Sequence, residues 1–209
     1  MISIDINSKK IRRFHTIAAN CSAICWWLAI LMMIVHLYFC FEPWKWTADT
    51  IFPHALFKNE SIIRSLICLR WVLQILIYFL FGRAILKKDE KQLIVLPTCA
   101  IILSIIRGFL LGFSWVNYMW DIICWVIILE WMICIKRLNE SDNSLKSKLC
   151  LIVFGIVLIF FRSYYTDAEY ITVSDYIAFF SFIIQDMIRS IAMIFFGIWL
   201  LTTRKKPVG

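Results

Sequence analysis

The sequence contains little charge and few residues that break helices. Asp, Glu, Lys and Arg make up only 17% of its 209 residues, whereas 62% are hydrophobic and the mean hydropathy is +0.80. Such a composition leaves little room for a water-soluble domain and indicates a single transmembrane domain over residues 1–209. With only six Gly and four Pro, the chain also has few of the sites at which transporters interrupt their helices.

Motifs for the common catalytic chemistries are missing from the sequence. It contains no phosphate loop, no HExxH, no GxSxG and no Rossmann fingerprint. None of the eight Cys forms a CxxC pair, and His15, Cys21 and Cys25 have no fourth metal ligand nearby. We therefore expect no enzyme activity, no catalytic residue, no cofactor and no metal site.

His15 and Cys21 resemble the closely spaced His and Cys of membrane peptide-processing endopeptidases of the AgrB-like family. The resemblance covers two residues and lacks the glycines that flank such a site. On a helix, a separation of six residues also places the two side chains about 240° apart. We therefore do not expect a peptidase.

Hydrophobic residues gather in six stretches. Their bounds are about 17–41, 62–86, 93–114, 116–135, 149–165 and 176–202. A helix that crosses a bilayer needs roughly 20 apolar residues, and most of these stretches are long enough. We predict an all-α polytopic membrane protein with about six transmembrane helices. The fifth stretch is the shortest, so a four- or five-helix count with a re-entrant segment remains open.

Positive charge falls on one side of these stretches. Most of the 22 Lys and Arg lie in the tails and alternate loops: Lys9, Lys10, Arg12, Arg13, Arg83, Lys87, Lys88, Lys91, Lys136, Arg137, Lys146, Lys148, Arg204, Lys205 and Lys206. By the positive-inside rule, both termini are predicted to be cytoplasmic. We expect the protein in a bacterial inner membrane. Because these cations flank apolar spans, they predict contact with anionic lipid or a cytoplasmic protein partner, and not with nucleic acid.

Six ionisable residues lie within the predicted spans, where each needs a partner, a cavity or a function. At about 1.5 Å rise per residue, Arg70, Arg107 and Asp121 fall roughly 8–12 Å from the outer boundary and form a predicted outer layer. Glu130, Asp186 and Arg189 fall at roughly 17–21 Å and form a deeper one.

Helical spacing adds detail to this polar network. Asp186 and Arg189 are three residues apart, and Gln185 lies four before Arg189, so the three share a face. Arg70, Gln74 and Tyr78 repeat every four residues and form a second stripe. The charges either neutralise one another across helices or line a path or cavity, and the sequence leaves both readings open.

Ser104, Gly108 and Gly112 place a small residue at every fourth position of the third span. Such a face lets two helix backbones approach closely. It predicts helix packing, either within the subunit or between subunits of a homo-oligomer.

Three functions compete at this point. The first is a non-enzymatic, homo-oligomeric subunit that senses or anchors and couples to a cytoplasmic partner, similar in type to small membrane proteins of phage-defence (Kiwa-type) or toxin-immunity systems. The second rests on Ala19 and Ala23, an AxxxA pair in the first span. In this pair, and in its six predicted helices with both ends inside, the chain resembles substrate-binding components of energy-coupling-factor vitamin transporters. The third is an ion or proton pathway through the charged layers.

Overall fold

The computed structural model describes residues 2–41, 59–111, 115–140, 149–150, 152–157 and 173–202. These residues are almost entirely helical and contain no strand, so the predicted all-α class is confirmed for them. Five long helices are α1 (Ile2–Phe41), α3 (Glu60–Lys87), α4 (Glu90–Leu111), α5 (Trp115–Glu140) and α7 (Val173–Thr202). Residues 152–157 form a further short helix.

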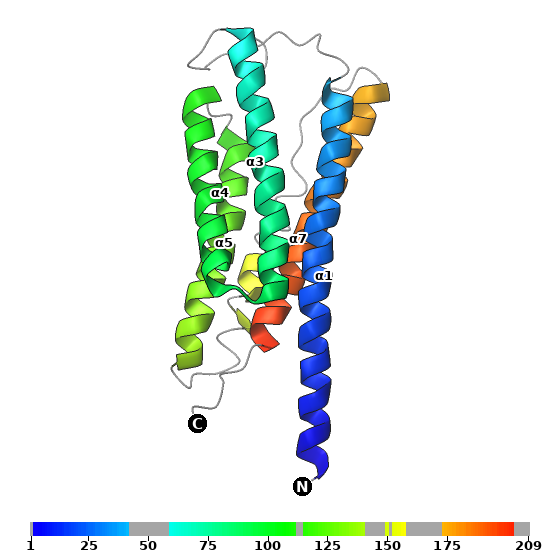
Figure 1. The fold of residues 1–209 in the computed structure, drawn as a ribbon, viewed down its shortest axis with the longest axis vertical. Coiled ribbons are helices and arrows are strands. Elements are labelled where there is room, and N and C mark those ends of the chain that lie inside the picture. The colour runs from blue at the N-terminus through cyan, green and yellow to red at the C-terminus, as the bar shows by residue number, and fades with distance from the viewer. Residues whose placement is uncertain are drawn as a thin grey trace.

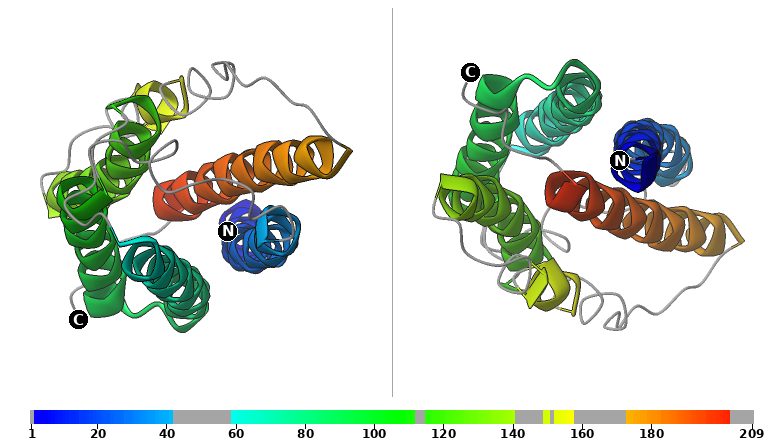
Figure 2. Two further views of the ribbon diagram at one scale, coloured as in Figure 1. Left: turned by 90° about the horizontal axis from the view of Figure 1, so that it is seen from above. Right: turned by 90° about the horizontal axis from the view of Figure 1, so that it is seen from below.

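The five long helices form a closed ring. Each contacts its neighbours in the order α1, α3, α4, α5, α7 and back to α1, and the largest contact is between α1 and α7. The helices α1 and α4 run in one direction and α3, α5 and α7 in the other (Figure 1). The start of α1 and the end of α7 therefore lie at the same end of the bundle. Viewed along the long axis, α7 is seen largely lengthwise, so it is inclined to the bundle (Figure 2).

Four helices in the described part of the chain are long and apolar enough to cross a membrane. These candidate spans are Ile11–Tyr38, Ser65–Lys87, Glu90–Leu110 and Ile183–Thr202. They support a membrane protein, but the predicted count of six is not confirmed. The predicted span 116–135 lies in α5, which is not among the four, and 149–165 is only partly within the described residues.

The ends of α3 explain how the chain turns back on itself. Asn59 caps its start, because its side-chain oxygen accepts hydrogen bonds from the backbone N–H of Ser61 and Ile62 at 2.9 and 3.4 Å. At the other end Lys88 adopts a left-handed conformation, with φ 54°, and its N–H reaches Ala84 and Ile85. Asp89 then accepts a hydrogen bond from the N–H of Gln92 and so starts α4 within two residues.

Small residues on α1 allow two neighbouring helices to approach closely. Ser22 donates a buried hydrogen bond of 2.8 Å to the carbonyl of Ala192 on α7. On the side of α3, a Cβ at Gly82 would lie only 3.3 Å from the carbonyl of Ala23 and 2.7 Å from Nε1 of Trp27. Because lipid removes the hydrophobic driving force between helices, such close van der Waals contacts hold the bundle together.

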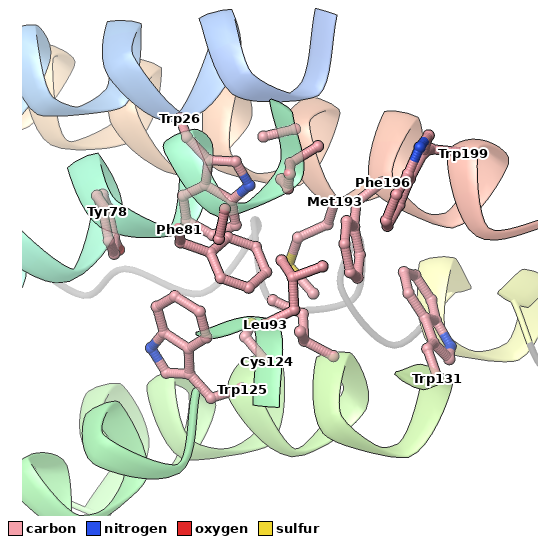
Figure 3. Close-up of a cluster of buried hydrophobic side chains, with 14 of the residues drawn as sticks. Trp26, Tyr78, Phe81, Leu93, Cys124, Trp125, Trp131, Met193, Phe196 and Trp199 are labelled. Carbon is pink, nitrogen blue, oxygen red and sulfur yellow. The ribbon is translucent and has the colours of Figure 1, made fainter. Parts of the chain in front are cut away.

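Aromatic side chains fill the middle of the ring (Figure 3). Trp26 of α1 stacks on Trp125 of α5, with ring centroids 5.4 Å apart, and Phe81 of α3 packs edge-on against both. Trp131 of α5 occupies a slot made by two glycines, because a Cβ at either would meet its ring. These are Gly155 of the short helix and Gly197 of α7.

We expect Gly82→Leu to lower the melting temperature of the purified protein, because a larger side chain forces α1 away from α3 at Ala23. A matched control is Val72→Leu, which adds bulk to a side chain of the same helix that is 62% exposed. Thermal unfolding in detergent measures both. Equal stability of the two variants would show that the α1–α3 contact does not require a glycine.

Candidate intramembrane polar site

Arg189 lies at the centre of the polar site and is only 4% exposed. Its Nη1 donates hydrogen bonds to Oδ1 of Asp121 at 2.7 Å and to the hydroxyl of Tyr78 at 3.2 Å. Its Nη2 lies 3.1 Å from Oδ1 of Asp186, one turn earlier on α7. One guanidinium therefore joins α7 to α5 and to α3.

The predicted stripe on α3 contributes the next contacts. Gln74 Nε2 donates a 3.0 Å hydrogen bond to the hydroxyl of Tyr78, which is fully buried. Arg70 Nη2 lies 3.9 Å from Oδ2 of Asp121, and its guanidinium lies 4.7 Å from the centre of the Trp71 ring. The distance from Arg70 to Asp121 is too long for a hydrogen bond, so Arg189 makes the stronger contact with this carboxylate.

The predicted pair of Asp186 and Arg189 is confirmed, but the separation of the charges into two layers is wrong. Asp121 was expected in the outer layer and Arg189 in the deeper one, yet they are in direct contact. Counting residues along upright helices overestimates the depth of Arg189, because α7 is inclined (Figure 2) and because a long Arg side chain spans several ångströms. Glu130 does not join the site, since it is exposed on the face of α5 that points away from Asp121.

Gln185, one turn from Arg189, is only 3% exposed. Its side-chain oxygen has no hydrogen-bond partner among the described residues. Near it on the same helix, the hydroxyl of Ser181 lies 3.5 Å from Nδ1 of His36 on α1. The polar stripe predicted for α7 therefore faces the inside of the bundle.

Next to this network is a cleft of about 110 Å³ between α3, α4 and α5. The residues that line it are Leu66, Leu69, Arg70, Leu73, Gln74, Ile77, Ala100, Leu103, Ser104, Ile106, Arg107, Leu110, Asp121 and Trp125. Arg70, Arg107 and Asp121, which were predicted to lie together, all line this cleft. The cleft itself was not predicted, and the only sequence signal for its α4 wall is the three-residue spacing of Ser104 and Arg107.

The small-residue stripe of α4 faces its own subunit. Ser104 lines the cleft and Gly108 is buried within the single chain, whereas Gly112 lies outside the described residues. The burial of Gly108 favours packing within the subunit.

His15 of α1 contacts the last turn of α7, away from the polar site around Arg189. Its Nε2 accepts a 3.1 Å hydrogen bond from the indole N–H of Trp199, and its Nδ1 lies 3.0 Å from the hydroxyl of Thr202. Sequence reasoning missed these contacts because nearly the whole chain separates the partners. Among the described residues no group of His, Cys, Asp and Glu could hold a metal ion.

The described cations of the predicted inner surface lie together at one end. Arg12 and Arg13 of α1 are exposed there, as are Lys87, Lys88 and Lys91 around the turn between α3 and α4 (Figure 1). Lys9, Lys10, Lys136 and Arg137 lie on helical backbone at the same end, in α1 and α5. Lys146 and Lys148 lie outside the described residues.

Comparison of the chain with family models, with curated proteins and with solved structures finds no significant match in any of the three. The function therefore has to be argued from the chemistry and placement of the residues themselves.

We expect Arg189→Met to lower the free energy of unfolding by roughly 3–5 kcal/mol, because it leaves two buried carboxylates without their main cation. Asp186→Asn should cost less, since Arg189 keeps its 2.7 Å contact with Asp121. The double variant Arg189→Met with Asp121→Asn should be more stable than Arg189→Met alone. Chemical unfolding in detergent measures all three variants, and a double variant no more stable than Arg189→Met would contradict a compensating role for Arg189 and Asp121.

Proposed function

We propose that this chain is a non-enzymatic, multi-pass protein of a bacterial inner membrane that senses or anchors and couples to a cytoplasmic protein partner. The observation that carries the proposal is the collection of exposed cations at one end of the bundle. Cations of this kind attract anionic lipid and also speed encounter with an acidic partner surface.

The shape of α1 supports a partner in addition to lipid. Its candidate span begins at Ile11, but the helix itself begins at Ile2 and continues beyond the other helices as a rod (Figure 1). Lys9 and Lys10 lie on this extension, and Arg12 and Arg13 follow directly. A helix that leaves the membrane offers a protein a rigid contact surface that a lipid does not need.

Helix directions support six crossings with both termini in the cytoplasm. The helices α5 and α7 run the same way, so the end of α5 and the start of α7 lie at opposite ends of the bundle. The proposal of six crossings assigns one further crossing to the interval between them. The cationic end then lies inside, in accordance with the positive-inside rule.

The two alternative functions receive less support from the geometry. Ala19 and Ala23, the AxxxA pair, are 5% and 0% exposed in the single chain, so they are not available for contact with a transporter partner. An ion pathway would have to pass the layer of Trp26, Phe81 and Trp125 that packs next to the polar site. The small-residue stripe of α4 also gives less support to a contact between subunits, since Gly108 is buried within the single chain.

We expect reporter fusions or cysteine labelling to place positions 10, 88, 143 and 206 inside and positions 58 and 169 outside. The reason is that every Lys- and Arg-rich segment then faces the cytoplasm. Labelling of Lys88 by a membrane-impermeant reagent in intact cells would overturn this orientation.

We expect a photo-crosslinking amino acid at position 88 to capture one discrete protein in living cells, because this residue lies in the exposed basic surface. The same probe at Val72, on the apolar face of α3, should not capture it. Neutralising Arg12, Arg13, Lys87 and Lys91 with Gln should abolish the adduct, whereas Glu90→Gln, in the same turn region, should preserve it.

Mass spectrometry then identifies the captured protein. Capture of a soluble effector whose gene neighbours the gene of this protein would support a role in phage defence or immunity. ATPase genes in that neighbourhood would favour a transporter. Capture of lipid alone at position 88 would contradict the proposal that this surface binds a protein partner.

A further inference from the structure

The cleft between α3, α4 and α5 opens sideways. Two of its lining residues, Leu69 and Ile106, are large apolar side chains that are 55% and 46% exposed. Exposed Leu and Ile on a membrane-spanning helix face lipid chains. An occupant of the cleft can therefore enter directly from the bilayer, between α3 and α4.

The charged groups of the lining favour an anion. The lining contains two guanidinium groups, of Arg70 and Arg107, and one carboxylate, of Asp121. That carboxylate also accepts a 2.7 Å hydrogen bond from Arg189 and lies 3.9 Å from Arg70. Taken together, the cleft lining and the adjoining network contain three guanidinium groups and only two carboxylates, of Asp121 and Asp186. Guanidinium groups bind phosphate and carboxylate through paired hydrogen bonds, and they do so most strongly where water is scarce.

Apart from Gln74 and Ser104, the remainder of the lining is apolar, and this favours a lipid over a water-soluble anion. Leu66, Leu69, Leu73 and Leu103 contribute hydrocarbon surface beside the charged groups. A volume of about 110 Å³ is too small for a whole lipid. It suits a head-group oxyanion and the first part of a chain that leaves through the lateral opening.

We propose that this cleft binds a membrane lipid whose head group carries a net negative charge, with its phosphate or carboxylate held by Arg70 and Arg107 and the acyl chain lying against the leucines. The site lies far along α3 from the basic end, so it does not depend on the proposed partner. Ser104 also lines the cleft, and its hydroxyl would donate a further hydrogen bond to the head group.

The test is native mass spectrometry of the full chain with phosphatidylglycerol, oleate or phosphatidylcholine, together with melting temperatures in the presence of each. We expect the protein to retain phosphatidylglycerol or oleate in preference to phosphatidylcholine, and the comparison of the first two identifies the head group. Arg107→Gln should reduce this preference about tenfold, as expected for one charge-assisted hydrogen bond. Inorganic phosphate alone should not raise the melting temperature.

Two control variants keep the test decisive. Arg83→Gln removes an exposed arginine of α3, the helix that carries Arg70, that does not line the cleft, and it should leave the preference unchanged. Ser104→Leu fills the cleft without changing its charge and should also reduce lipid retention, which covers the case in which Arg107→Gln fails to fold. Equal retention of all three lipids by the wild type, equal loss in Arg83→Gln, or protection by inorganic phosphate alone would overturn the proposal.

Discussion

One buried guanidinium fixes how three helices of this bundle meet. Arg189 is almost inaccessible and contacts Asp121 of α5, Tyr78 of α3 and Asp186 of its own helix. A charge without partners in a low-dielectric interior costs several kcal/mol, and sliding or rotating α7 would separate Arg189 from both Asp121 and Tyr78. The ion network therefore sets the register of α7, even if its net contribution to stability is small.

The rest of the packing follows from what lipid cannot supply. Apolar faces of α1, α3 and α4 lie exposed, because lipid chains solvate them as well as another helix would. The helices instead attract one another through close van der Waals contact, which small residues permit. These residues are Ser22 against Ala192 and Gly82 against Ala23. Stacked Trp26 and Trp125 then fill the wider middle of the ring next to the charged layer.

Local spacing was enough to predict the helices in the described part and the contacts within each helix. Asp186 with Arg189, and Gln74 with Tyr78, follow from separations of three and four residues. Contacts between helices depend on tilt, which periodicity does not contain. For this reason Asp121 and Arg189 were placed in different layers, and Glu130 was grouped with residues that it does not meet. The contact of His15 with Trp199 had no local signal at all.

The cleft and the basic end share α3. This helix is continuous from Glu60 to Lys87, with Arg70 and Gln74 at the cleft and Lys87 at the basic turn. Its hydrogen-bond ladder does not stretch, so a displacement of Arg70 along the axis also displaces Lys87. The capped turn through Lys88 and Asp89 then carries the movement into α4, whose Arg107 lines the same cleft. A sensor needs this mechanical continuity between its two sites, whereas an anchor needs only the basic end.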